Sequence, residues 1–153
     1  MSGSMEGPIF LIMIKVSSIL YNKIVEHSKA AYPHECCGVL AGVFGSGEVK
    51  AVTEVHALTN LNTERANDRY EVDPAELLRI EKDVASRKLD VLGFYHSHPD
   101  HPSRPSQFDR DRGWPDYSYV IVAVEGGKKT WAQCWTFTDM DAPFGEEELK
   151  IGE

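Results

Sequence analysis

Residues 91–99 read Val-Leu-Gly-Phe-Tyr-His-Ser-His-Pro, an apolar run that turns polar at its end. The first five residues are apolar or aromatic apart from Gly93, so they predict a buried strand that leads into His96. Side chains two apart on a strand point the same way, so the imidazoles of His96 and His98 can converge on one point. Such a pair supplies half of a metal site.

A second polar cluster begins eight residues after His98, at Ser106. Pro99, Pro102 and Pro105 stiffen the connection, because each ring fixes its own φ angle. Residues 106–109 then read Ser-Gln-Phe-Asp, the Ser-x-x-Asp form of a helix start, and a helix beginning there brings Asp109 back toward the strand end. Two neutral imidazoles and a carboxylate are a usual catalytic zinc set, in which a water of pKa roughly 7 takes the fourth position. The residue types therefore suit hydrolysis at neutral pH.

Each part of this pattern also has a plain structural explanation. A single histidine is more often a structural residue than a metal ligand. Ser106 and Asp109 could serve only to cap the helix that they begin. The metal interpretation therefore depends on the combination of residues and not on any one of them.

The combination His96-x-His98, seven residues, Ser106, two residues, Asp109 resembles the signature of the JAMM, or MPN+ (Mov34/MPN/PAD-1), zinc metalloprotease family. Residues 33–42, Pro-His-Glu-Cys-Cys-Gly-Val-Leu-Ala-Gly, are similar to the Glu-x-Cys-Gly-x-Leu-x-Gly segment around the family's upstream glutamate. The resemblance covers nearly the whole chain, and it is to the compact bacterial members in particular.

The resemblance implies a role for each residue of the pattern. His96, His98 and Asp109 would hold one Zn²⁺ per chain. Glu35 would take a proton from the attacking water and hand it to the leaving amine. Ser106 would donate a hydrogen bond to the developing oxyanion. Without the distal motif, Glu35 would be interpreted as a surface carboxylate after a helix.

The same resemblance implies a metallopeptidase or isopeptidase that cuts after the C-terminal Gly-Gly of a ubiquitin-like protein, here a bacterial sulfur-carrier protein. Two alternatives stay open. A deubiquitinase-like isopeptidase acting on ubiquitin conjugates is less favoured, because the chain lacks the long insertions and the extra Cys/His cluster that such enzymes can carry. A non-catalytic MPN interaction scaffold usually lacks a ligand, and none is missing here. A zinc deaminase is excluded, because it needs His-x-Glu and a later Pro-Cys-x-x-Cys, and the sequence contains neither motif.

The fold expected is α/β: a single MPN-like domain over residues 8–145, with a mixed, mainly antiparallel β-sheet flanked by helices in a cytidine-deaminase-like architecture. Residues 1–7 are interpreted as a tag or disordered start, and residues 146–153 as an acidic tail. The remaining expectations are helices over about 18–31 and from 73 onward, strands at 8–14, 36–44, 49–58, 119–124 and 130–137, a tight turn at 45–47, and a functional loop at 59–71.

Composition narrows the possible partners and compartments. At 153 residues and 42% hydrophobic, the chain has the size of one domain. A formal charge of -8 argues against nucleic acid as a partner. The apolar run at residues 8–14 is too short to span a bilayer. Three cysteines, two of them adjacent, form no disulfide framework, so a reducing cytoplasmic setting is expected.

Overall fold

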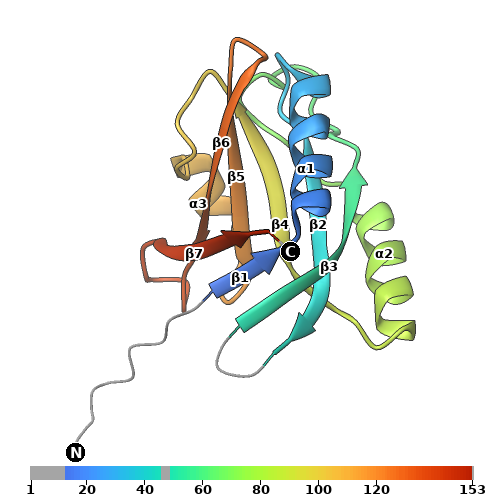
Figure 1. Cartoon of the computed structure of the whole chain (residues 1–153). Helices are drawn as coiled ribbons and strands as arrows, with labels where there is room; N and C mark the ends of the chain where they lie inside the picture. Colours follow the sequence, from blue (N-terminus) through green and yellow to red (C-terminus); the bar gives the residue numbers. More distant parts are fainter. Residues whose placement is uncertain (1–12, 46–48, 153) are drawn as a thin grey trace, which may run out of the picture.

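The computed structural model describes residues 13–45 and 49–152, which form seven strands and three helices (Figure 1). In chain order these are β1 (Met13–Val16), α1 (Ser18–Ala31), β2 (Cys37–Phe44), β3 (Val49–Leu58), α2 (Pro74–Ser86), β4 (Asp90–Pro99), α3 (Gln107–Arg112), β5 (Ser118–Glu125), β6 (Lys129–Thr136) and β7 (Gly145–Ile151).

The seven strands close into a barrel in the order β1-β3-β2-β4-β5-β6-β7. Strand β1 pairs in parallel with β3 and β7, and β4 pairs in parallel with β5, while the other four pairings are antiparallel. The prediction of a mixed, mainly antiparallel sheet with helices is therefore confirmed. Closure of the sheet was not apparent from the sequence, and the cytidine-deaminase-like architecture is not confirmed.

Residues 145–151 correct one prediction. The acidic segment expected to be a tail is strand β7, which pairs with both β1 and β6. Its acidic residues alternate along the strand, so Glu147 is 2% exposed while Glu146 and Glu148 face solvent. An acidic segment can therefore form the strand that closes the barrel. Only one of its carboxyl groups, that of Glu147, is buried and needs a partner.

Helix boundaries follow the capping residues in the sequence. The Ser17 side chain accepts a hydrogen bond from Leu20 N at 3.2 Å, and α1 ends at Ala31, before Pro33. Asp73 caps α2 in the same way, with Pro74 in the first turn. Both predicted helices are confirmed. The predicted strand at 8–14, the turn at 45–47 and the start at 1–7 lie wholly or partly outside the described residues.

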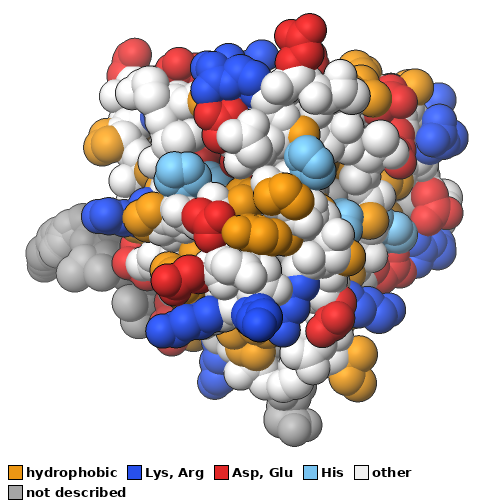
Figure 2. All heavy atoms as spheres, turned by 90° about the horizontal axis from the view of Figure 1, so that it is seen from above, with side chains coloured by type: hydrophobic (Ala, Val, Ile, Leu, Met, Phe, Trp, Pro, Cys, Tyr) orange, Lys and Arg blue, Asp and Glu red, His pale blue; other side chains and the backbone are white. Residues whose placement is uncertain are grey.

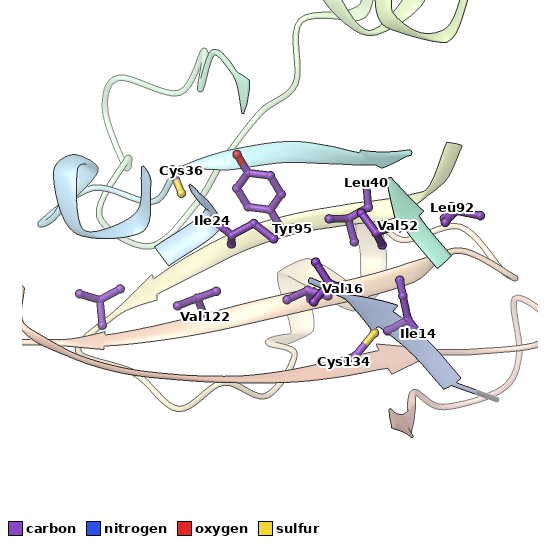
Figure 3. Close-up of a cluster of buried hydrophobic side chains, with 12 residues drawn as sticks. Ile14, Val16, Ile24, Cys36, Leu40, Val52, Leu92, Tyr95, Val122 and Cys134 are labelled. Atoms are coloured by element: carbon purple, nitrogen blue, oxygen red, sulfur yellow. The ribbon is translucent and has the colours of Figure 1, made fainter. Parts of the chain in front are cut away.

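Two apolar clusters lie on opposite sides of strands β2 and β4. The larger, shown in Figure 3, lies between the strands of the barrel and includes Leu92 and Tyr95 of β4. The smaller joins these strands to α2, and Val91 and Phe94 of β4 pack there. In a regular strand, residues three apart point to opposite sides, yet Leu92 and Tyr95 share one side of β4. The reason is that the register of β4 against β2 shifts between Gly93 and Val91. This irregularity shifts the alternation of all the following side chains on β4.

Gly93, next to this register shift, allows β5 to approach β4 closely. A Cβ atom at Gly93 would lie 1.9 Å from the carbonyl oxygen of Ser118 on β5. The alternation that resumes after it places His96 and His98 on the same side of β4 as Phe94, outside the barrel interior.

A buried ionic network joins three strands inside the barrel. Lys50 on β3 donates to Ser118 Oγ on β5, and Ser118 Oγ donates to Glu147 Oε1 on β7, each at 2.6 Å. Lys50 Nζ lies 3.7 Å from Glu147 Oε2.

Among the described residues, no helix is long and apolar enough to cross a membrane.

Replacing Glu147 with alanine is expected to destabilise the fold by about 3–5 kcal/mol, because Lys50 would keep a buried charge without its partner. Urea unfolding followed by circular dichroism would measure the change. The matched control is Glu148→Ala on the exposed side of β7, which is expected to change stability by less than about 0.5 kcal/mol. Equal effects of the two variants would contradict the role given to the network.

Candidate metal centre

Three of the predicted site residues converge at the end of β4 and the start of α3. The Nε2 atoms of His96 and His98 lie 3.2 Å apart. Asp109 Oδ2 lies 3.2 Å from His96 Nε2 and 3.0 Å from His98 Nε2. All three residues are buried, with 1%, 5% and 7% of their surfaces exposed. This is a group that could hold a metal ion.

The triangle of ligand atoms fits a tetrahedral metal. Zinc with ligand distances of about 2.0–2.2 Å separates neighbouring ligand atoms by about 3.3–3.6 Å. The three observed separations are a few tenths of an ångström smaller, so a slight outward movement of the ligand atoms accommodates the ion. Two nitrogens and one carboxylate oxygen are also a usual donor set for zinc.

The α3 N-terminus orients the carboxylate. Ser106 Oγ accepts a hydrogen bond from Asp109 N at 3.1 Å, and Asp109 Oδ2 accepts one from Ser106 N at 2.9 Å. This is a reciprocal capping box, and it starts the helix predicted at Ser106. The capping role and the metal role are therefore compatible, because Asp109 Oδ2 serves both.

His98 has a hydrogen-bond partner that sets its tautomer. Its Nδ1 lies 2.7 Å from the carbonyl oxygen of Pro102 and can donate only to it, which leaves Nε2 as the ring nitrogen available to a metal. The loop that supplies this carbonyl is anchored on β6 by the buried Ser103. Ser103 Oγ donates to Gln133 Oε1 at 2.7 Å, and Trp135 Nε1 donates to Ser103 O at 2.8 Å.

His96 Nε2 faces His98 and Asp109, and ring stacking supports its imidazole from one face. The Tyr70 ring lies parallel to its imidazole, with ring centroids 4.6 Å apart and planes inclined by 28°. His96 Nδ1 is buried and has no hydrogen-bond partner among the described residues. Tyr70 was missed in the sequence, where it appears only as one aromatic residue at the end of a polar loop.

Glu35 lies beside this centre, between α1 and β2. Its backbone N–H donates to Ala66 O at 2.6 Å, and Asn60 Nδ2 donates to Glu35 O at 3.1 Å. Residues 59–71 form the predicted loop, whose ends are joined by one isolated bridge between Asn60 and Val72. The loop therefore fixes the backbone that carries Glu35.

Ser97, between the two histidines, holds the same segment from the other side. Its Oγ accepts a hydrogen bond from Cys36 N at 2.9 Å, and its N–H donates to Cys36 O at 3.1 Å. Ser97 points to the opposite side of β4 from the two histidines, so it contacts Cys36 without disturbing them. The strand that presents the imidazoles therefore also fixes Cys36, the residue after Glu35.

The electrostatics match the protonation states that metal ligands need. Burial raises the pKa of Asp109, but His96 and His98 outweigh it and hold that pKa well below its usual value. Burial lowers the pKa of His96. A carboxylate and a neutral imidazole are therefore the favoured forms. Without a metal ion, burial, followed by the negative charges of Asp109 and Asp68, raises the pKa of Glu35 to about 9. A cation bound at the ligand triangle would lower this pKa and favour the carboxylate form that can accept a proton.

Glu35, His98 and Ser106 line one pocket of about 660 Å³. Ser106 Oγ uses a lone pair to cap α3, so its O–H group is still able to donate. Glu35 Oε1 is buried with no hydrogen-bond partner among the described residues. Seen from above, the molecule exposes histidine side chains among hydrophobic, basic and acidic ones (Figure 2).

Comparison with known proteins defines the class. Residues 17–138 match the family model described as prokaryotic homologs of the JAB domain, so the chain belongs to this family. This is the JAB/MPN family that the sequence motif resembles.

Individual relatives agree with this assignment. The chain is 40% identical to a desampylase of Haloferax volcanii over 105 residues, which cover 68% of this chain and 71% of that protein. It is 31% identical to a CysO-cysteine peptidase of Mycobacterium tuberculosis over 149 residues, covering 97% and 96%. The solution structure of DSY2949 from Desulfitobacterium hafniense is similar with a TM-score of 0.80 and 30% identity, covering 92% of this chain and 94% of that one.

Replacing Asp109 with asparagine should lower zinc affinity more than about 100-fold, a loss beyond the 10–100-fold typical of residues that only support the ligands. The amide oxygen can still accept from Ser106 N, so α3 should keep its cap. Competition with a chromogenic zinc chelator measures the affinity. Asp111→Asn, on the exposed side of α3, is the control and should bind zinc like the wild type. Unchanged affinity in Asp109→Asn would contradict the ligand assignment.

Proposed function

We propose that this protein is a zinc-dependent peptidase or isopeptidase that hydrolyses the bond after the C-terminal Gly-Gly of a ubiquitin-like protein, with a bacterial sulfur-carrier protein as substrate. The observation that carries the proposal is the ligand triangle of His96, His98 and Asp109, with Glu35 and Ser106 in the pocket that His98 lines.

The proposed mechanism divides the reaction among these residues. His96, His98 and Asp109 would hold the zinc ion, which would supply Lewis acidity toward the carbonyl and the attacking water. Glu35 takes a proton from the attacking water as its oxygen bonds to the carbonyl carbon. The C–N bond then breaks, and the same proton passes from Glu35 to the leaving nitrogen. Ser106 donates its hydroxyl hydrogen to the carbonyl oxygen while that oxygen carries negative charge.

The substrate class is supported by the relatives and by a groove. The names desampylase and CysO-cysteine peptidase both describe the removal of a ubiquitin-like protein or of a group attached to one. A groove of about 800 Å³ borders the C-terminal end of α3, whereas the Glu35 pocket borders its N-terminal end. We call it the aromatic groove, because five aromatic side chains are among its lining residues: Tyr70, Phe94, Trp114, Tyr117 and Tyr119. Tyr70 belongs to this groove and stacks on His96, so the groove reaches the metal centre. We place the extended Gly-Gly tail there.

The tail does not add to the strand that carries the histidines. Strand β4 is hydrogen-bonded to β2 on one side and to β5 on the other. Backbone pairing with the substrate therefore falls to the loop at residues 59–72.

A cytoplasmic location is part of the proposal, supported by three buried and free cysteines.

Replacing Glu35 with glutamine should lower turnover by about 10²–10⁴-fold while one zinc stays bound, because the amide cannot carry the proton between water and amine. Turnover is measured on two conjugates, CysO–cysteine and lysine-linked diubiquitin, with zinc content determined in parallel. Glu64→Gln, in the exposed part of the loop, is the control and should retain activity.

The same assay separates the alternatives. Cleavage of diubiquitin alone would favour the deubiquitinase-like function. A zinc-loaded wild type that cuts neither conjugate would favour the interaction scaffold. Full activity in Glu35→Gln would contradict the proton-transfer role.

A further inference from the structure

The pocket beside Glu35 is basic, although the whole chain carries a net charge of -8. It lies between the loop at 59–72 and the segment at 100–108, and we call it the basic pocket. Arg65, Arg69 and Arg104 line it together with His101, against the carboxyl groups of Glu35 and Asp68. A local excess of positive charge in an acidic protein points to an anionic ligand.

Two of the three arginines are available to such a ligand. Arg65 is engaged by Asp68, with its Nε donating to Oδ1 at 3.1 Å and a second bond from its terminal nitrogen to Oδ2. Arg69 and Arg104 form no ion pair with any carboxylate of the described residues, 13–45 and 49–152. The free charge of the pocket therefore comes from these two side chains.

Arg69 is held in a geometry that suits a carboxylate. Its guanidinium carbon lies 4.7 Å from the centre of the Phe108 ring, and Arg112 lies at the same distance from that ring. The Arg69 side chain donates no hydrogen bond to another described residue, so its N–H groups are free for two parallel hydrogen bonds to a carboxylate. Arg104 is exposed and lies in the loop between the ligands His98 and Asp109.

The chemistry of the proposed function decides what enters this pocket. Glu35 must deliver its proton to the leaving nitrogen, so the leaving group lies on the side of the metal centre where Glu35 lines the pocket. The acyl tail then occupies the aromatic groove beyond α3. When the leaving group is a single amino acid, its carboxylate carbon is two covalent bonds from the scissile nitrogen, and the carboxylate falls within the basic pocket.

We propose that the basic pocket binds the free α-carboxylate of the leaving group, with Arg69 and Arg104 as specificity-determining residues. The substrate is then a ubiquitin-like protein joined to one amino acid or a short peptide with a free carboxyl end. A volume of about 660 Å³ is within the range of small-molecule sites and too small for a folded protein. This inference rests on the proposed function, because it uses Glu35 to orient the substrate.

The test compares two substrates that differ only in this carboxylate. CysO–cysteine is prepared as the free acid and as the C-terminal amide, and kcat and KM are measured for each with the zinc-loaded enzyme. The wild type should prefer the acid by about tenfold or more, as expected for one or two charge-assisted hydrogen bonds. Arg104→Gln should lower kcat/KM for the acid about tenfold, mainly through KM, and leave the amide unchanged.

Two further variants complete the design. Arg69→Gln should act in the same direction as Arg104→Gln and replaces it if that variant fails to fold. Arg79→Gln on α2 removes the same charge from an exposed position outside the pocket and should behave like the wild type. Circular dichroism confirms folding in each case.

Equal hydrolysis of acid and amide by the wild type would overturn the inference, as would an equal loss of both in Arg104→Gln. If the wild type cuts neither substrate, the proposed function fails, and calorimetric binding of the two intact conjugates to the same protein then decides the inference. Tighter binding of the acid by about tenfold would support it, and equal binding would overturn it.

Discussion

One carboxylate oxygen joins the helix and the strand that form the candidate metal centre. Asp109 Oδ2 accepts a hydrogen bond from Ser106 N at 2.9 Å and lies within 3.2 Å of the Nε2 atoms of His96 and His98. Because the same oxygen completes the helix cap and faces both imidazoles, the position of α3 and the geometry of the site are fixed together. Gly93 contributes from a distance, since the register shift beside it places the histidines outside the barrel interior.

The position of α3 also divides the surface around the centre. The basic pocket with Glu35 borders the N-terminal end of this helix, and the aromatic groove that includes Tyr70 borders its C-terminal end. The loop at residues 59–72 borders both, because it supplies Arg69 to the first and Tyr70 to the second. A single loop thus holds the backbone of Glu35, stacks on His96 and supplies charge to the pocket. Its polar sequence reflects these several hydrogen-bonded contacts.

Sequence reasoning succeeds where the pattern is local. The helix start at Ser106 follows from a four-residue cap, and alternation along a strand was enough to bring two histidines to one side. It fails where the partner is distant in sequence. Tyr70 and Ser103 act through residues about 26–32 positions away, on another element, and nothing in their immediate neighbours signals this. Glu147 was assigned to a tail because an acidic run is usually solvated, whereas Lys50, almost a hundred positions earlier, provides its buried partner.

The most direct test of the account is the zinc content of the purified protein after zinc reconstitution, determined by elemental analysis for the wild type and for His98→Ala. Loss of one imidazole leaves two of the three ligand atoms and should abolish stable binding. The account predicts about one zinc per wild-type chain and almost none in the variant. A wild type that stays metal-free, or a variant that retains its zinc, would contradict it.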